Sequence, residues 1–347
     1  MGEAAHAPGM RGHSARFGAA GLAALDDLRG AVLAPSTAAE LVPPPRFAAK
    51  TFATYRTDAA LPAQAAAVER VRHFATARRP LLGWLPFRAP ERKGLYLDGG
   101  FGVGKTHLLA ASFHAAHGRR RYLSFAEAIS LVVLRGAGQA AELLASDLVC
   151  IDEFELDDPA NTRLADLLLE QLVRRGCRIV TTSNTVPGEL GLGRMAVDQF
   201  RNQLARIADV FEDVHVPGLD HRLRGRVAGD ADPAGWGPAV APWDPAPTAF
   251  VFTADELDTL LSRIPIANLR RLAMRLGRLT ITGLMPFVDQ LAALRFVHLV
   301  DKLYDSCTAL RVITPAPLSG LFPEEHCQRA FAKKYQRCSS RLVELCV

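Results

Sequence analysis

The residues most suited to chemistry lie at positions 99–106, where glycines, a lysine and a threonine are spaced as a phosphate-binding turn requires. The stretch reads G-G-F-G-V-G-K-T and fits the pattern G-x-x-x-x-G-K-[ST]. Its glycines let the backbone wrap closely around phosphates, and N–H groups of the turn and of a following helix point at the anion. Lys105 is expected to reach the β- and γ-phosphates, and Thr106 to bind Mg²⁺ through its hydroxyl. The pattern therefore predicts a site for ATP and its metal.

A second candidate element, which is acidic, follows at positions 148–153. There the apolar run L-V-C-I ends in Asp152 and Glu153. The run indicates a buried strand, so both carboxylates are expected at its end, beside the glycine turn. Asp152 is expected to hold Mg²⁺, through water because this ion dehydrates reluctantly. Glu153 is expected to act as general base on the attacking water. A strand ending in a solvated acidic turn is the structural alternative, and the position 47 residues after Lys105 favours the metal site.

A third group of polar residues follows the next strand-like run, which ends in T-T-S-N. Asn184, at the tip of that strand, is expected to touch the γ-phosphate or to position the water; the alternative is a polar turn before Pro187. Phosphoryl transfer also gains from an arginine at the developing charge. Arg194 is the first candidate and Arg201 the second, although in an arginine-rich chain each can equally be a surface residue.

Strand-like and helix-like stretches alternate between these motifs. The strand-like runs are 94–98, 121–125, 147–152, 178–183 and 211–216. The helix-like runs are 62–78, 105–116, 126–134 with a continuation to 145, 160–175 and 195–208. This order predicts an α/β fold, a phosphate-loop sandwich in which helices cover both faces of a parallel sheet.

The composition divides the chain into four parts. Residues 1–45, rich in Ala, Gly and Pro, are expected to be a partly disordered lead-in or to carry one short helix around 19–31. Residues 46–224 form the predicted nucleotide domain, and the Pro- and Gly-rich stretch 225–249 reads as a linker. Residues 250–347 are dominated by helical patterns, with Thr253 as the cap of a helix through Leu261 and another helix over 286–304.

The overall composition is that of an ordinary globular protein. The 347 residues are 49% hydrophobic and 22% charged, and the net charge of +5 is too small for a dedicated nucleic-acid binder. The six cysteines form no C-x-x-C pair, which argues against a zinc or redox site, and no H-E-x-x-H or G-x-S-x-G motif of a protease occurs. No secretory signal or membrane span is visible, so we expect a cytoplasmic protein.

Taken together, the motifs resemble the ZapE family of cell-division ATPases. The resemblance rests on G-G-F-G-V-G-K-T-H-L-L, C-I-D-E-F-E-L-D-D-P and T-S-N-T, continues in the C-terminal R-F-V-H-L-V-D-K-L-Y-D, and covers roughly residues 50–315. It implies an AAA+-type ATPase with a small C-terminal helical lid and a site for ATP between subunits, hence an ATP-dependent homo-oligomer. It also implies a link to the division ring through FtsZ and peripheral association with the inner face of the cell membrane. The chain departs from this family at His221, in D-H-R at 220–222, because the family usually has a tyrosine before this arginine.

These motifs and the resemblance give three sets of candidate site residues. The nucleotide-binding set is Gly99, Gly100, Phe101, Gly102, Val103, Gly104, Lys105, Thr106, His107 and Asp152, with Arg295 of the lid added by resemblance. The catalytic set is Glu153, Lys105, Asn184 and Arg194, and the Mg²⁺ ligands are Thr106 and Asp152.

Two other functions use the same kind of nucleotide domain. A helicase loader of the AAA+ type would call for a concentrated basic face with aromatic residues, whereas aromatic residues make up only 7% of this chain and its arginines are dispersed. A small-molecule kinase would transfer the phosphoryl group to an acceptor, whereas the carboxylate pair with Asn184 favours water as the nucleophile. No specific nucleic-acid partner is therefore expected.

Overall fold

A computed structural model describes most of the chain. The described residues are 28–33, 37–77, 93–100, 102–156, 159–184, 197–218, 249–315, 317–323 and 332–346. Several predictions lie outside them: Phe101, Arg194, the side chain of Arg201, His221, the lead-in up to residue 27, and nearly all of the linker, residues 225–248. The predicted division of the chain into domains therefore stays a prediction.

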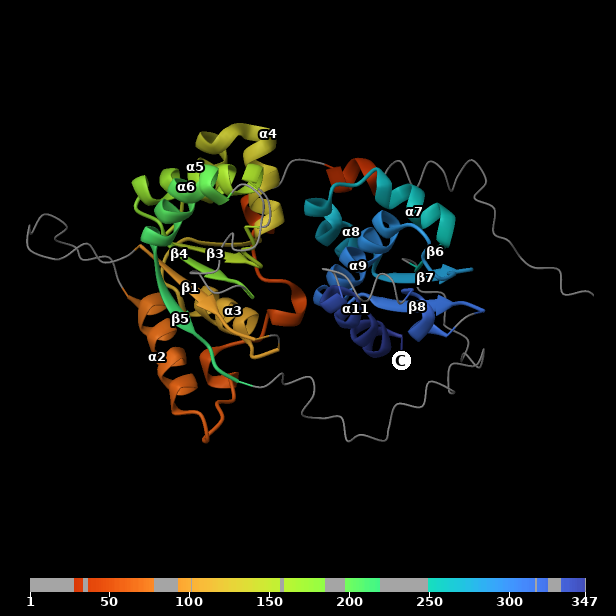
Figure 1. The fold of residues 1–347 in the computed structure, drawn as a ribbon, viewed down its shortest axis with the longest axis horizontal. Helices are drawn as coiled ribbons and strands as arrows, with labels where there is room; N and C mark the ends of the chain where they lie inside the picture. Colours follow the sequence, from red (N-terminus) through yellow and green to blue (C-terminus); the bar gives the residue numbers. More distant parts are fainter. Residues whose placement is uncertain are drawn as a thin grey trace, which may run out of the picture.

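The first body of the molecule is built on five parallel strands (Figure 1). They are β1 (Gly94–Asp98), β2 (Arg120–Ser124), β3 (Leu148–Asp152), β4 (Arg178–Thr182) and β5 (Phe211–His215), in the order β2-β3-β4-β1-β5. All five strands predicted from the sequence are confirmed, within one residue at each end. Helices cover both faces of the sheet, and every residue of the central strand β1 is buried. The edge strand β5 also has exposed residues.

Five helices cover this sheet. They are α2 (Pro62–Thr76), α3 (Lys105–Ala115), α4 (Phe125–Leu144), α5 (Pro159–Arg174) and α6 (Val197–Val210). Side chains alternate along the strands: Leu95 and Leu97 pack in one core with α2 and α3, and Tyr96 packs in the other with α4, α5 and α6. The parallel α/β sandwich predicted from the sequence is therefore confirmed.

Helix α4 is bent at a glycine. It begins at Ser124, which accepts a hydrogen bond from the N–H of Glu127 as a helix cap. Gly136 has φ 75° and ψ 156°, outside the helical region, and the chain resumes its helical path after it. This bend corresponds to the expected helix over 126–134 with its continuation to 145.

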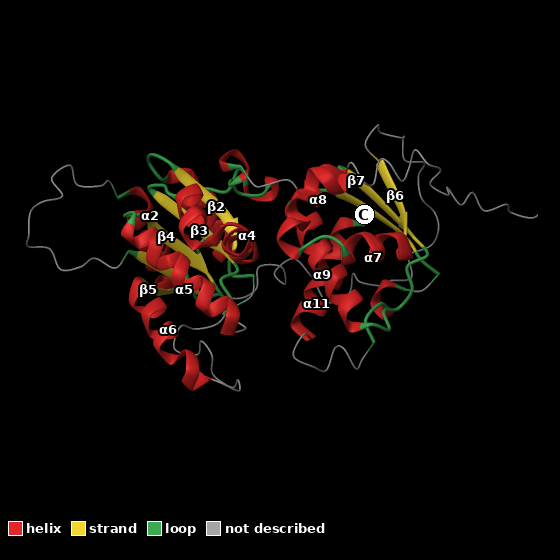
Figure 2. Cartoon of the chain, turned by 90° about the horizontal axis from the view of Figure 1, so that it is seen from above, coloured by secondary structure: helices red, strands yellow, loops and turns green. Residues whose placement is uncertain are grey.

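The second body, at the C-terminal end, is a smaller α/β unit (Figure 2). Its helices are α7 (Ala254–Ser262), α8 (Leu269–Leu276), α9 (Gln290–Asp305) and α11 (Ala332–Leu345). Thr253 caps α7 as predicted. The helix expected over 286–304 begins later, because Asp289 provides the cap by accepting hydrogen bonds from the N–H groups of Leu291 and Ala292.

This unit also contains a parallel sheet that the sequence did not predict. Its strands are β6 (Ala249–Thr253), β7 (Arg278–Thr282) and β8 (Ala309–Ile313), paired in chain order. Each strand has five residues, as in the first sheet, but β7 buries only two of them and β8 only one, so they lack an unbroken apolar run such as that of β3. Among the described residues, no helix is both long and apolar enough to cross a bilayer.

The N-terminal segment connects the two bodies. Residues 28–33 are helical, and Leu28 and Val32 are buried in the core of the C-terminal unit. The amide of Asn268 donates to the carbonyl of Val32 at 2.7 Å. Leu41, a few residues later, is buried in the core of the first body, and its carbonyl accepts from the N–H of Tyr122 at 2.9 Å. Part of the expected lead-in thus belongs to both cores.

Candidate nucleotide site

The glycine turn has the backbone geometry that its glycines allow. Gly99, Gly102 and Gly104 have φ values of 145°, 69° and 96°, and Gly104 is the residue before the first turn of α3. A Cβ atom on Gly99 would lie 2.4 Å from the carbonyl oxygen of Val216, so no side chain fits there. The turn leads directly into the first turn of α3, and the N–H groups at such a helix start are suited to bind an anion.

Lys105 is buried and folds back on the turn. Its Nζ donates to the carbonyl oxygens of Gly99 at 2.8 Å and Gly100 at 2.7 Å. The side chain is only 8% exposed, so its ammonium is largely removed from water. Phosphate oxygens would be strong acceptors for an ammonium in this position.

The glycine turn is stabilised by the segment before it. The Tyr55 hydroxyl donates to the carbonyl of Val103 at 2.7 Å, and the ring of Tyr55 packs edge-on against that of His107. The Nε2 atom of His107 lies 2.9 Å from the carbonyl of Thr51 and 3.1 Å from the hydroxyl of Thr54. Val103 is fully buried. Val103 and His107, both predicted to bind nucleotide, therefore have structural contacts of their own.

Asp152 lies beside the glycine turn, as the sequence predicts. The hydroxyl of Thr106 donates to its Oδ1 at 3.2 Å, which joins the start of α3 to the end of β3. Thr182 of β4 donates to the same oxygen at 2.5 Å, and Tyr122 of β2 donates to Oδ2 at 2.8 Å. Three neighbouring elements thus fix the orientation of this carboxylate.

The donor set at this point suits magnesium. Burial and the nearby charge of Glu153 raise the pKa of Asp152, so a cation beside it would be stabilising. Thr106 and Asp152 supply hard oxygen atoms of the kind Mg²⁺ prefers. Among the described residues, no group of three or more His, Cys, Asp or Glu side chains could hold a metal. A magnesium ion here would therefore take most of its ligands from phosphate and water.

Glu153 has an unusual backbone and faces the C-terminal unit. Its φ is 55°, which is rare outside glycine, and its N–H donates to the Thr182 hydroxyl at 3.0 Å. Its carboxylate lies 3.8 Å from Nζ of Lys302 on α9 and 4.0 Å from Nη1 of Arg337 on α11. Lys302 above all, and Arg337 with it, hold the pKa of Glu153 well below its usual range.

Asn184 lies at the end of β4, the strand between β3 and β1. Its amide nitrogen donates to Oε1 of Glu155 at 3.1 Å. Asn184 is thus near the acidic segment, because β4 lies next to β3 in the sheet. Its contact with a phosphate or with the attacking water stays a prediction.

The two arginine candidates for the developing charge, all of Arg194 and the side chain of Arg201, lie outside the described residues. Arg295, on α9, donates to Asp258 of α7 at 2.8 Å, an ion pair within the C-terminal unit. Its role as a nucleotide sensor stays a prediction.

Four side chains of this site were missed by the sequence analysis. Thr182 and Tyr122 hold Asp152, and Lys302 and Arg337 face Glu153. Strands β2 and β3 are neighbours, and their register pairs Tyr122 with Cys150 and Ser124 with Asp152. If this strand order had been assumed from the sequence, Tyr122 would have been expected close to Asp152. No sequence pattern connects Glu153 with the two cations, because their approach depends on how the two bodies pack.

Comparison with known proteins gives a consistent result. The sequence model of the AFG1-like ATPase family matches residues 33–231 and 272–347. The cell division protein ZapE of Escherichia coli K12 is 26% identical over 299 residues, which cover 73% of this chain and 78% of that protein.

Three solved structures share a distant likeness. DnaA of Aquifex aeolicus bound to AMPPCP is 18% identical with a TM-score of 0.34, and covers 50% of this chain and 51% of its own. DnaI is 17% identical with a TM-score of 0.39, and the match covers 53% of this chain and 98% of DnaI. The DnaC helicase loader is 20% identical with a TM-score of 0.35, and the match covers 49% of this chain and 98% of the loader. Scores this low say nothing about function.

Proposed function

The chain belongs to the AFG1-like ATPase family, and from that premise we propose that it couples Mg²⁺-dependent ATP hydrolysis to work on a protein partner. One observation supports the site most strongly: the hydroxyl of Thr106 lies 3.2 Å from Asp152, which brings the glycine turn and the acidic strand end together. A triphosphate and its metal need these two groups side by side.

Each residue of the site has a role in this proposal. The N–H groups of the turn and Lys105 bind the phosphates, and Thr106 with Asp152 holds the metal. Magnesium, when bound, neutralises the charge that develops on the phosphate oxygens. Glu153 accepts a proton from the attacking water, and Asn184 orients that water.

The position of Glu153 bears on when it can act. In the structure, Lys302 and Arg337 lie within 4.0 Å of its carboxylate and depress its pKa, and a weaker base accepts a proton less readily. We infer that turnover requires the C-terminal unit to move these cations away from Glu153 or to share them with the nucleotide. The position of the C-terminal unit would then control the basicity of the Glu153 carboxylate.

The partner is proposed from the relative. The Escherichia coli protein is named as a cell division protein, and the resemblance described above points to FtsZ. We propose FtsZ, or another division protein, as the partner, with the chain acting as an ATP-dependent homo-oligomer in the cytoplasm. Peripheral association with the inner face of the membrane is proposed on the same ground.

Phosphate release by the purified full chain tests this proposal. We expect release from ATP and Mg²⁺ without any added acceptor, a faster rate with FtsZ polymer, and a larger particle size with ATP. Lys105→Ala serves as the inactive control. No release above that control would refute the hydrolase; release that FtsZ leaves unchanged would refute the partner alone.

A further inference from the structure

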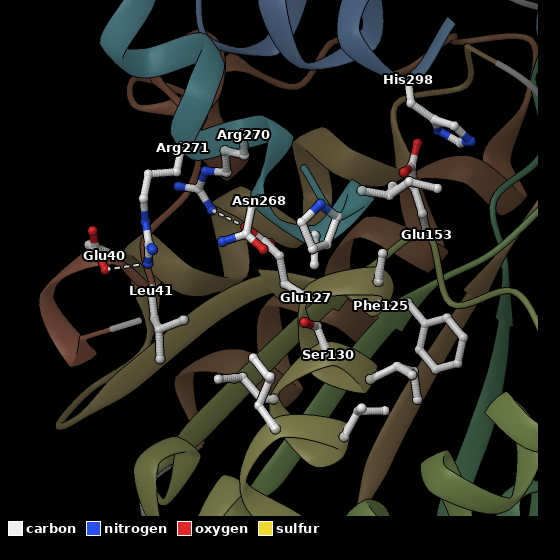
Figure 3. A pocket seen from close by; sticks show the side chains of 18 of the residues that line it. Glu40, Leu41, Phe125, Glu127, Ser130, Glu153, Asn268, Arg270, Arg271 and His298 are labelled. Atoms are coloured by element: carbon white, nitrogen blue, oxygen red, sulfur yellow. Dashed lines mark hydrogen bonds and ion pairs between the residues drawn. The ribbon is translucent and has the colours of Figure 1, made fainter. Parts of the chain in front are cut away.

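A large cavity separates the two bodies beside the nucleotide site. It has a volume of about 1300 Å³ and is lined by the N-terminal segment, by α4 of the first body, and by α8 and its neighbours in the second. Figure 3 shows side chains from both bodies pointing into it, with Phe125 on one side and His298 on the other. Small-molecule pockets typically measure about 300–1,000 Å³, so this cavity is large enough for a segment of polypeptide.

Exposed apolar side chains gather in this cavity. Among the described residues, thirteen large apolar side chains are exposed, and six of them line it. They are Leu33, Val42, Val133, Leu134, Ile266 and Met274. Leu134 and Val133 on α4 are 74% and 67% exposed, just before the bend at Gly136. An exposed apolar patch of this kind, lying in a concavity, is typical of a binding surface.

The charges around the apolar residues favour an acidic occupant. The lining contains six arginines and lysines, one histidine and four carboxylates. Three carboxylates each lie near a cation of the same cavity: Glu40 by Arg271 at 2.9 Å, Glu127 by Arg270 at 3.9 Å, and Glu153 by Arg337. Arg275, exposed on α8 next to Met274, adds to the positive excess. Such a surface attracts carboxylates and repels basic segments.

We propose that this cavity binds an acidic amphipathic segment of a partner protein, whose apolar face packs on Val133, Leu134 and Met274 while its carboxylates approach Arg275 and the neighbouring cations. Such packing is the helix-in-groove mode, with anchors spaced as on one helical face. Because Glu153 lines the same cavity, the segment would lie beside the proposed general base. The proposal extends the partner-directed role above, and its test needs no ATP hydrolysis.

A designed peptide pair tests the proposal on the full chain. One fluorescein-labelled 14-residue helix carries leucines at i, i+3, i+4 and i+7 with glutamates on the other face; its twin carries lysines instead. We expect the glutamate peptide to bind at least tenfold tighter by fluorescence anisotropy, and salt to weaken it. Leu134→Asp should weaken binding of the glutamate peptide about tenfold or more, because it removes an apolar anchor and places a negative charge close to the glutamates.

Matched variants separate this site from a general effect. Leu167, on α5, is 40% exposed and does not line the cavity, so Leu167→Asp should leave the affinity unchanged. Arg275→Glu should reduce the preference for the glutamate peptide, whereas Arg163→Glu on α5 should not. Equal binding of the two peptides, no binding of either, or equal effects of Leu134→Asp and Leu167→Asp would overturn the proposal. If Leu134→Asp loses self-association but keeps its affinity for the peptide, the surface binds a second copy of this chain. That result would also overturn the proposal.

Discussion

Replacing Lys302 with methionine removes the closer of the two cations that face the Glu153 carboxylate. The two charges lie 3.8 Å apart. Coulomb's law with an effective dielectric constant of about 20 gives about 4 kcal/mol at such a distance. The Glu153 side chain is 42% exposed, however, so solvent screening and side-chain ordering reduce the net value to about 1 kcal/mol. That corresponds to a rise of about 0.7 units in the pKa of Glu153.

The sign of the effect follows from the direction of the shift. Lys302 favours the ionised form of Glu153, so its removal makes the carboxylate protonate at higher pH. The acid limb of kcat/KM for ATP hydrolysis, which reports groups of the free enzyme, should therefore move to higher pH by about 0.7 units in Lys302→Met. Because the pKa of Glu153 in the parent chain is about 2, steady-state phosphate release is measured from pH 8 down to about pH 2, with circular dichroism at each pH to check that the chain stays folded.

Lys302→Arg is the matched control, because it keeps the charge. Its acid limb should stay near that of the parent chain. An unchanged acid limb in Lys302→Met, or an equal shift in both variants, would refute the inference that this ion pair controls the basicity of Glu153.

The remaining predictions concern the glycine turn and the carboxylate pair. Lys105→Ala should abolish binding of a fluorescent ATP analogue, because the ammonium at the turn is lost; retained affinity would remove Lys105 from the site. Glu153→Gln should bind ATP normally and stop phosphate release, and continued turnover would exclude Glu153 as the base. Gly99→Ala should destabilise the fold by about 1–3 kcal/mol in urea unfolding, because the new Cβ meets the Val216 carbonyl and the φ is positive. Gly138→Ala, where a Cβ meets nothing within 4 Å, should cost no stability, and equal unfolding of the two variants would count against the clash.

The nucleotide half of the site was predictable because its determinants are local. The turn at 99–106 needs glycines and a lysine at fixed spacing, and a strand buried on both faces reads as an unbroken apolar run such as the one before Asp152. Parallel strands then bring the ends of β1, β3 and β4 to one edge without further information.

The C-terminal contacts were not predictable in this way. Lys302 and Arg337 reach Glu153 from more than 140 residues away, through the packing of two bodies. The motif at 295–305 contains Lys302, but nothing in it indicates a contact with Glu153. The helix at 28–33 packs in a core whose other members begin at Phe252, which composition alone does not indicate. The sheet of β6, β7 and β8 was missed because β7 and β8 bury few of their residues and have no unbroken apolar run.

The central claim is that ATP and magnesium bind between the glycine turn and Asp152, and calorimetric titration of ATP with and without Mg²⁺ tests it most directly. The parent chain should bind ATP more tightly when Mg²⁺ is present. Asp152→Asn should lose that Mg²⁺-dependent gain while it keeps the weaker metal-free binding. No binding by the parent chain, or a full magnesium effect in Asp152→Asn, would contradict the claim.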